Sequence, residues 1–558
     1  MPEAPFELLS LPESSFRRSM SSRHEGVEMS TVREAAYAVL RSFGATTVVA
    51  NPGSNELPFL DRMPEDFRFI LALQEGSVIS IADGYAQASG KPVVVSVHSA
   101  AGLATGMGAL TNAYDNGAPL IILAGQQFRA LITEEAIVTN RDATVLPRPL
   151  VKWSFEAPSA QSVPAVLARA AACALTAPTG PVCVSIPLDD WRRESDSDTD
   201  GYAATRRISG NPQVPQADID RVAQRLENAA NPVLVLGPDV DKYGGWEAAV
   251  ALAGKLRMEV YLGSGEYSRM PFPTDHRCFR GALGATVAQV RDQLAPYDVV
   301  AWIGGALLPY HGWSPGPYLS GDPEVIHITA DPAQAARAPL GWSIVGDPAA
   351  ALWQLAEAVA TSARPMPAAR PAPEPAPAGG HFTEHQLWDV LAETRPAGAQ
   401  FVWDAPSMIG WWNRVPITEP RTYYAPGAAT VGFGLPAAVG VSLARPAGPT
   451  VAILGDGASN YTIAGLWTAA RHGCDVTFVI LRNGTYQVLE DYAVMLDAQL
   501  PDITLQGIDF VSLATGYGVA AERVSTPDEA ATALRRAFAT PGPHLIEVNV
   551  SAQSSGMY

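Results

Sequence analysis

The segment Leu454-Gly455-Asp456-Gly457-Ala458-Ser459-Asn460 follows an apolar run, 450–454, and Arg482-Asn483-Gly484-Thr485 follows a second one, 476–481. Both runs have the length and composition of buried strands, and 463–472 between them has a helical pattern. Neighbouring parallel strands end at the same edge of a sheet, which is where such proteins bind ligands. The pattern therefore predicts that the polar segments after the two runs lie together at one sheet edge.

Asp456 and Asn483 carry the oxygen ligands that Mg²⁺ requires, and phosphate oxygens can complete its coordination. Gly455 and Gly457 allow backbone N–H groups to approach a pyrophosphate closely. Gly-Asp-Gly triplets also occur in ordinary turns, so these residues alone leave two interpretations open: a metal–pyrophosphate site or a turn.

The composition is that of a globular protein with more than one core. A chain of 558 residues is expected to form roughly three domains. Its 47% hydrophobic and 17% charged residues are typical of globular proteins. The balance of 38 basic against 56 acidic residues, a net charge of −18, argues against nucleic-acid and anionic-membrane partners. No apolar run is long enough to cross a membrane.

The N-terminus and the cysteines indicate a cytoplasmic protein. Residues 1–28 lack the apolar core of a secretory signal, and we expect them to form a disordered tail. The four cysteines are scattered without metal-ligand spacing, which is typical of buried, reduced thiols.

Two segments have the composition of linkers. Asp189–Gly201 is rich in charged residues, and 362–380 is a Pro/Ala spacer that would run extended. They divide the chain into 29–190, 202–361 and 381–558. Helix and strand patterns alternate within each part, which predicts parallel sheets covered by helices on both faces. The expected fold is therefore three doubly wound α/β domains.

Two residues in the first part are candidates for proton chemistry. Glu75 follows an apolar strand and leads into a helix of small residues, where it is either a functional carboxylate or an acid that favours the helix N-terminus. His98 ends a strand and precedes a run of small residues. A histidine at a strand tip is well placed for proton transfer near neutral pH, although a structural role is equally compatible with its position.

Ser54 and His311 are weaker candidates. Ser54 follows a strand and a Pro-Gly turn, so it could hold a carboxylate or cap a helix. His311 lies in a loop after the strand pattern of 299–303, and by itself it favours no function. The sequence contains no Gly-x-Ser-x-Gly elbow, Walker loop or paired-cysteine metal site.

Taken together, these segments resemble the thiamine-diphosphate-dependent 2-oxo-acid decarboxylase superfamily, and within it the benzoylformate decarboxylase family. The resemblance covers almost the whole chain after the N-terminal tail. It is carried by Asn51–Phe59, Ile70–Glu75, Ile81–Ser89, Val97–Gly102, Gly125–Gln127, Leu146–Trp153, Gly237–Asp241, Gly432–Pro436 and Trp467–Ala470.

The resemblance implies a pyrimidine-binding, a central and a pyrophosphate-binding domain, in that order. The implied cofactors are thiamine diphosphate and Mg²⁺. It also implies self-association into at least a dimer, and a homotetramer is usual in the family. Each active site would then take Glu75 from one subunit and Asp456 and Asn483 from another.

The resemblance also assigns roles toward the cofactor. Asp456, Asn483 and the backbone carbonyl of Thr485 would bind Mg²⁺. Val431 would be the apolar wedge that bends the cofactor, and Glu75 would hydrogen-bond its aminopyrimidine ring. Further cofactor contacts are expected at Asn51, Pro52, Ala429, Gly455, Gly457, Ala458 and Tyr486.

The substrate implied by the resemblance is a small 2-oxo acid. Ser54 would hold its carboxylate, and His98 and His311 would transfer protons. The expected substrate pocket includes Ile137, Val138, Ala425, Pro426, Leu489 and Tyr492.

Several positions depart from the benzoylformate decarboxylase pattern. Arg482 replaces the first residue of an Asn-Asn pair, and 487–492 carries acids where the family has an Arg and aromatics. Ala425-Pro426 replaces a bulky aromatic and a cysteine, and Trp403–Pro406 departs from a hydroxyl-rich stretch. These changes leave the cofactor chemistry intact and bear on the identity of the substrate.

The sequence therefore supports a first hypothesis and three alternatives. The first is a decarboxylase of an aromatic 2-oxo acid such as benzoylformate. A carboligase, which joins an aldehyde or another acceptor to the same intermediate, is the main alternative. A non-catalytic scaffold is disfavoured by the intact candidate residues, and an FAD-containing acetohydroxyacid-synthase-like enzyme is disfavoured by His98 and His311.

Overall fold

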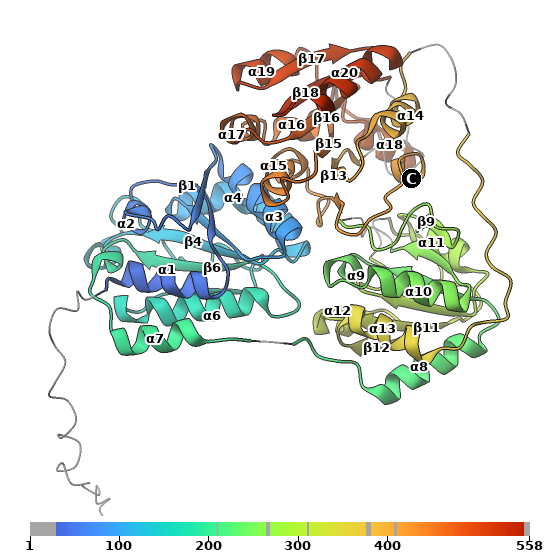
Figure 1. Cartoon of the computed structure of the whole chain (residues 1–558), viewed down its shortest axis with the longest axis horizontal. Helices are drawn as coiled ribbons and strands as arrows, with labels where there is room; N and C mark the ends of the chain where they lie inside the picture. Colours follow the sequence, from blue (N-terminus) through green and yellow to red (C-terminus); the bar gives the residue numbers. More distant parts are fainter. Residues whose placement is uncertain are drawn as a thin grey trace, which may run out of the picture.

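The computed structural model describes residues 30–208, 210–263, 268–309, 312–374, 376, 381–406 and 410–551. It contains three six-stranded sheets, and every strand pairing within them is parallel. Helices cover both faces of each sheet (Figure 1). The prediction of three doubly wound α/β domains is confirmed.

The three sheets lie within the sequence ranges predicted for the domains, while the domain boundaries themselves remain predictions. The predicted tail, 1–28, lies outside the described residues, as do 375 and 377–380 of the predicted linker. Within the described parts of the chain, no helix is long and apolar enough to cross a membrane.

The first sheet has the order β2-β1-β3-β4-β6-β5. Its strands are β1 (Thr47–Asn51), β2 (Arg68–Leu71), β3 (Val93–Val97), β4 (Leu120–Gln126), β5 (Trp153–Glu156) and β6 (Val182–Pro187). Its helices are α1 (Val32–Ser42), α2 (Leu57–Leu60), α3 (Glu75–Ser89), α4 (Ser99–Asp115), α5 (Arg129–Ile132), α6 (Val163–Leu175) and α7 (Ser197–Thr205). The central strands β3, β4 and β6 are buried along their whole length, as expected for a parallel sheet covered on both faces.

The second sheet has the order β12-β11-β10-β7-β8-β9. Its strands are β7 (Pro232–Leu236), β8 (Glu259–Leu262), β9 (Phe279–Ala282), β10 (Val299–Ile303), β11 (Glu324–Thr329) and β12 (Trp342–Val345). Its helices are α8 (Gln216–Asn228), α9 (Asp239–Lys242), α10 (Trp246–Leu256), α11 (Val287–Leu294), α12 (Pro332–Arg337) and α13 (Pro348–Ala358).

The third sheet has the order β14-β13-β15-β16-β18-β17. Its strands are β13 (Gln400–Asp404), β14 (Tyr423–Tyr424), β15 (Thr450–Gly455), β16 (Val476–Arg482), β17 (Ala520–Val524) and β18 (His544–Asn549). Its helices are α14 (Glu384–Thr394), α15 (Gly434–Ala444), α16 (Asp456–Asn460), α17 (Gly465–His472), α18 (Gln487–Leu496), α19 (Phe510–Gly516) and α20 (Pro527–Ala539).

Helices α3 and α15 join the first and third domains (Figure 1). A Cβ at Gly84 would lie 2.3 Å from the carbonyl oxygen of Ala437, and one at Gly440 would lie 2.0 Å from that of Ile81. Any larger residue at these positions would force the backbones apart. Most of both helices is buried, since each also packs on its own sheet.

The two predicted linkers differ in structure. The described part of 362–380 contains no helix or strand, and arginines hold it against the central domain: Arg277 Nη2 donates to the carbonyl of Pro367 at 2.9 Å and Arg280 Nη2 to that of Ala368 at 2.8 Å. Asp189–Gly201, by contrast, is not the wholly unburied linker that its charge predicted. Asp190 is buried because Arg129 pairs with it at 2.5 Å and compensates its charge. Trp191 is also buried, and α7 begins at Ser197.

A buried ion pair lies where the three domains meet. Arg269 Nε donates to Asp241 Oδ2 at 2.8 Å, and these side chains are only 3% and 1% exposed. Arg269 also reaches Gln87 Oε1 of the first domain at 3.2 Å, and Asp241 Oδ1 accepts the backbone N–H of Arg421 in the third domain at 2.9 Å. The pair therefore ties together elements of all three domains.

We expect the substitution Arg269→Met to lower the free energy of unfolding by about 3–5 kcal/mol, because it leaves Asp241 buried without its charge partner. Arg141→Met is the control, since Arg141 and Glu135 form a pair that is 68% and 58% exposed, and its loss should change stability by less than about 1 kcal/mol. Chemical denaturation of both variants measures the difference. Equal unfolding midpoints for the two variants would contradict the expectation.

Candidate active site

The carboxyl ends of β2, β1, β3 and β4, neighbours in the first sheet, gather one group of the candidate residues. Asn51 ends β1, and its Nδ2 donates to Oε1 of Glu75, the first residue of α3, at 3.0 Å. A Cβ at Gly102 would lie 3.2 Å from the same oxygen, so α4 also packs closely against Glu75. Glu75 is therefore both a helix N-terminal acid and a carboxylate held by a specific partner.

His98, directly after β3, makes a contact that the sequence analysis missed. Its Nδ1 lies 2.9 Å from Oε2 of Glu56, and the two side chains are 27% and 3% exposed. Glu56 belongs to the same motif as Ser54. Its position two residues after that serine was the only feature of the sequence that could have indicated a partner for His98. The 42-residue separation from His98 concealed the pairing.

Ser54 is exposed at this edge and does not cap a helix. Helix α2 begins at Leu57, and Glu56 precedes it without a side-chain capping bond. The capping alternative for Ser54 is therefore wrong, and its hydroxyl group remains available to a ligand.

An apolar segment after β4 borders His98. The carbonyl oxygen of Val138 accepts hydrogen bonds from Asn55 Nδ2 at 3.2 Å and from Ser99 Oγ at 2.9 Å. Asn55 and Ser99 adjoin Glu56 and His98 in sequence, so Val138 lies beside the pair. Ile137 is 87% exposed. The Val138 backbone is thus close to residues that adjoin the histidine, and the role of Ile137 and Val138 as an apolar wall stays a prediction.

The second group of candidates lies at the carboxyl ends of β15 and β16. The register pairs Gly455 with Leu481, so Asp456 and Asn483 follow adjacent strand ends, as predicted. The Asp456 carboxylate is 4% exposed, and its two oxygens accept the backbone N–H groups of Gly457 and Gly484, each at 2.8 Å. Burial raises the pKa of Asp456, and the two N–H groups partly offset this.

The donor set of this second group fits a hard divalent cation. Asp456, Asn483 and the carbonyl of Thr485 offer only oxygens, and no ion pair of Asp456 is present within the described chain. Asn483 Oδ1 accepts the N–H of Thr485 at 3.2 Å, which orients the amide. A Cβ at Gly457 would lie 2.5 Å from the Tyr486 ring, so only glycine leaves room there. A buried carboxylate without a cationic partner is what a bound metal would compensate.

Family models match all three domains. The N-terminal thiamine pyrophosphate-binding domain matches residues 30–144, the central domain 219–355, and the C-terminal thiamine pyrophosphate-binding domain 404–548. Benzoylformate decarboxylase from Pseudomonas aeruginosa is 46% identical over 523 residues, which is 93% of this chain and 99% of that protein.

The chain belongs to the thiamine pyrophosphate enzyme family.

Two further relatives, one at higher and one at lower sequence identity, are similar over almost their whole length. The structure of the thiamine diphosphate-dependent 4-hydroxybenzoylformate decarboxylase from Rhodococcus jostii RHA1 superposes with a TM-score of 0.92 at 41% identity, covering 94% of this chain and 100% of that one. The acetolactate synthase large subunit from Haemophilus influenzae is 27% identical over 542 residues, covering 92% of this chain and 93% of that protein. Thiamine diphosphate with a divalent metal, typically Mg²⁺, is the cofactor of this family.

Asp404, at the end of β13, anchors the segment that carries Val431. Its Oδ2 accepts the N–H groups of Gly432 and Gly434, each at 2.9 Å, and burial raises the pKa of Asp404 to about 6. The half-exposed Val431 directly precedes these two anchors, and Ala429 has a left-handed φ of 54°. The signal for this role was an acid directly after an apolar run, which was noticed only as a departure from the family pattern.

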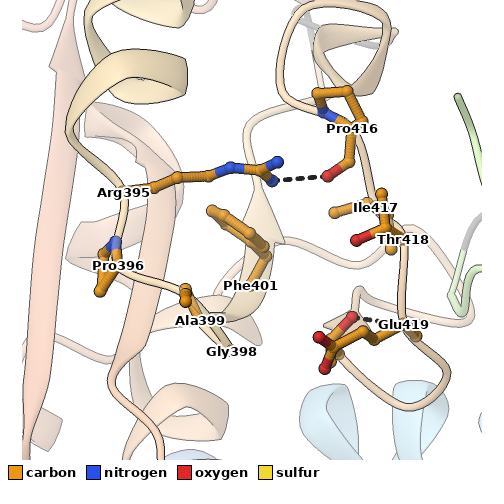
Figure 2. Close-up of a pocket in the computed structure, with 11 residues that line it drawn as sticks. Arg395, Pro396, Gly398, Ala399, Phe401, Pro416, Ile417, Thr418 and Glu419 are labelled. Carbon is orange, nitrogen blue, oxygen red and sulfur yellow. Dashed lines mark hydrogen bonds between the residues drawn. The ribbon is translucent and has the colours of Figure 1, made fainter.

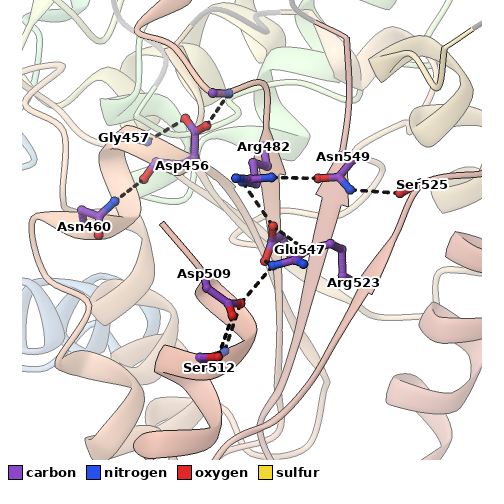
Figure 3. Close-up of polar contacts among 11 residues, drawn as sticks. Asp456, Gly457, Asn460, Arg482, Asp509, Ser512, Arg523, Ser525, Glu547 and Asn549 are labelled. Carbon is purple, nitrogen blue, oxygen red and sulfur yellow. Dashed lines mark hydrogen bonds and ion pairs between the residues drawn. The ribbon is translucent and has the colours of Figure 1, made fainter. Parts of the chain in front are cut away.

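Arg482, which departs from the family pattern, turns away from the candidate metal centre (Figure 3). Its Nε lies 3.3 Å from Oε1 of Glu547, a residue with no exposed surface, and its Nη1 lies 3.5 Å from Asn549 Oδ1. Glu547 also pairs with Arg523 at 2.9 Å. The strand β18 thus supplies the partner for the added charge, and the oxygen ligands beside Arg482 are kept.

The acids of 487–492 lie on α18, next to Thr485. The Thr485 hydroxyl group donates to Glu490 Oε1 at 2.5 Å, and Gln487 Nε2 donates to the buried Asp491 at 3.1 Å. Local hydrogen bonds therefore engage both acids. Leu489, on the same helix, is 45% exposed.

The remaining candidates differ in accessibility. Ala425 is 1% exposed, and its N–H donates to the carbonyl of Ser268 at 2.9 Å, so it is part of the core. Pro426, Tyr492 and Tyr486 are partly exposed, as are Asn51 and Pro52, and Ala458 is buried. His311 lies outside the described residues.

A cavity of about 310 Å³ is separate from this site (Figure 2). It is lined by Arg395 and Phe401, among others, and Arg395 reaches across it to donate to the carbonyl of Pro416 at 2.5 Å. It adjoins the amino end of β13, whereas Asp456 follows the carboxyl end of the parallel strand β15. The cavity therefore lies at the opposite edge of the sheet.

Asp404 predicts a specific pH dependence of stability. Because its pKa is about 6 in the folded protein and about 4 in an unfolded chain, its stabilising contribution is complete below about pH 4 and is lost as the pH rises through 6. The substitution Asp404→Asn removes this loss. The stability of the cofactor-free variant relative to the unchanged protein should therefore rise between pH 4 and pH 7, by at most about 3 kcal/mol.

Denaturation curves at several pH values measure this difference. Asp528→Asn, at an exposed carboxylate of the same domain, is the matched control and should follow the unchanged protein. A constant difference between Asp404→Asn and the unchanged protein across this pH range would refute the prediction.

Proposed function

We propose that this protein catalyses the thiamine diphosphate- and Mg²⁺-dependent, non-oxidative decarboxylation of an aromatic 2-oxo acid such as benzoylformate, releasing the aldehyde and CO₂. One observation carries the proposal: Ser54, Glu75 and the His98–Glu56 pair share one sheet edge. The similarity to two enzymes that are named as benzoylformate and 4-hydroxybenzoylformate decarboxylases supports it.

In this proposal the third domain holds the diphosphate through the metal. Asp456, Asn483 and the Thr485 carbonyl bind Mg²⁺, and Gly455, Gly457 and Ala458 border the diphosphate. Tyr486, Ala429 and Val431 shape the adjoining wall. When bound, thiamine diphosphate supplies a nucleophilic carbon and an electron sink.

The first domain positions the reacting groups. Glu75, oriented by Asn51, accepts a hydrogen bond from the cofactor's aminopyrimidine ring, with Pro52 beside it. Ser54 donates to the carboxylate of the substrate, and His98 transfers a proton near the substrate carbon. Val138 and Ile137 exclude water, which strengthens the polar interactions of the site. His311 is proposed as the second proton-transfer residue on the strength of the family resemblance alone.

We further propose that two copies of the chain complete each site. Exposed apolar side chains flank both groups of candidates: Leu57 is 59% and Ile137 87% exposed in the first domain, and Val494 is 84% and Leu496 65% exposed in the third. Burial of such surface favours association, so we propose at least a dimer and, by family resemblance, a homotetramer. A cytoplasmic location remains a prediction.

Incubation with benzoylformate, thiamine diphosphate and Mg²⁺ should yield benzaldehyde and CO₂. The Glu75→Gln variant should lose about 10²- to 10⁴-fold in rate, because it lacks the carboxylate needed for proton transfer. Chromatography of the products with and without added acceptor aldehydes separates decarboxylation from carboligation. Carboligation is the alternative function, and the distant similarity to an acetolactate synthase supports it. A rate that does not depend on Glu75 would exclude the proposal.

Removal of a metal ligand should abolish cofactor binding. Asp456→Ala should weaken Mg²⁺-dependent binding of thiamine diphosphate by more than about 100-fold, since even second-shell losses at metal sites reach that size. Asp528→Ala is the control at an exposed carboxylate of the same domain. Isothermal titration measures both variants, and unchanged affinity in Asp456→Ala would reject this metal site.

A further inference from the structure

We propose that Glu56 is a positioning residue that holds a proton on Nδ1 of His98, and thereby makes Nε2 the nitrogen that exchanges a proton with the substrate. The inference rests on the proposed function, which gives His98 its role. The contact of His98 Nδ1 with Glu56 Oε2 at 2.9 Å carries it.

The surroundings of Glu56 make its carboxylate an acceptor. Oε2 accepts the backbone N–H of Gly53 at 2.8 Å, and Oε1 accepts that of Ser99 at 3.3 Å. His98 is its only ionisable partner within the described chain. The Glu56 side chain is 3% exposed, and its carboxylate already accepts two N–H groups. Because a buried carboxylate is stabilised by hydrogen-bond donors, the group that contacts it from His98 should be a third donor. The hydrogen at Nδ1 of His98 is that donor.

The ring is also fixed by close packing. A Cβ at Gly53 would lie 2.2 Å from Nδ1 of His98, and a Cβ at Gly125 would lie 1.8 Å from Oε1 of Glu56. The loop after β1 and the end of β4 therefore pack closely against the pair, and the two glycines leave room for it.

His98 lies at the N-terminus of a helix, where a nearby carboxylate such as that of Glu56 is favourable. His98 is the N-cap of the 17-residue helix α4, and a helix N-terminus carries roughly half a positive charge, which disfavours an imidazolium. A full negative charge in direct hydrogen-bond contact outweighs that half charge.

Nε2 is the nitrogen left for the substrate. The bond made by one ring nitrogen determines the protonation of the other, and Nε2 has no hydrogen-bond partner among the described residues. The imidazole is 27% exposed, beside Val138 and on the edge that also presents Ser54. A second interpretation is purely structural: Glu56 could only hold the loop through Gly53 and Ser99.

Solid-state NMR of protein labelled with ¹³C and ¹⁵N in its histidines separates the two interpretations. The difference spectrum against a His98→Asn variant assigns the His98 ring. We expect Nδ1–H in the unchanged protein and a shift toward Nε2–H in Glu56→Gln, whose amide can donate to Nδ1. Asn55→Ala, which removes a neighbouring hydrogen bond to Val138, is the control and should keep the original tautomer.

Steady-state kinetics provides the second measurement. Glu56→Gln should lower kcat by about 10²-fold or more with a change in KM of only about threefold, since a wrongly protonated histidine still binds substrate. Glu56→Asp, which keeps the carboxylate, should restore part of kcat. An unchanged His98 tautomer in Glu56→Gln would overturn the inference, whatever the activity. No turnover of 2-oxo acids by the unchanged protein would instead reject the proposed function, because the tautomer is measured without substrate.

Discussion

The close approach of α3 and α15 is the constraint on which the rest of the structure depends. Their backbones meet at Gly84 and Gly440, where a Cβ would lie within 2.3 Å of the facing carbonyl oxygens. Helix α3 begins at Glu75, and α15 begins just after Val431 and its anchor on Asp404. The contact between the two helices thus sets how the two cofactor-binding domains of one chain are oriented.

Charge at the site is managed by pairing rather than by exposure. Glu56 accepts a hydrogen bond from His98 and Glu547 pairs with Arg482, while away from the site, where the three domains meet, Asp241 pairs with Arg269. Asp456 is the exception, because its buried carboxylate receives only backbone N–H groups. Removing a partner from such buried pairs costs more than forming the pair contributes, which explains why added charges such as Arg482 come with a buried counter-charge.

Much of the fold could be predicted from the sequence. The patterns over 299–303, 450–454 and 476–481 correspond to β10, β15 and β16, with bounds that agree to within one residue. These segments are long, apolar and bounded by turns. The strand patterns missed β5, β8, β9, β12 and β14, where four residues or fewer show no clear period, and they also missed the longer strands β6, β17 and β18. Asp189–Gly201 was misread because its partner, Arg129, lies far away in sequence.

By itself, the sequence determined the parallel α/β architecture and the juxtaposition of Asp456 with Asn483, because these depend on periodicity and on the ends of strands that follow each other closely in the chain. The cofactor family followed from the resemblance of several motifs to known enzymes. Only the tertiary structure decided that Glu56 holds His98, that Asp404 anchors the turn after Val431 and that Arg482 turns toward Glu547. Each of these contacts joins residues that are far apart in the chain and that the tertiary structure brings together, and no pattern within a single strand or helix encodes such a pairing.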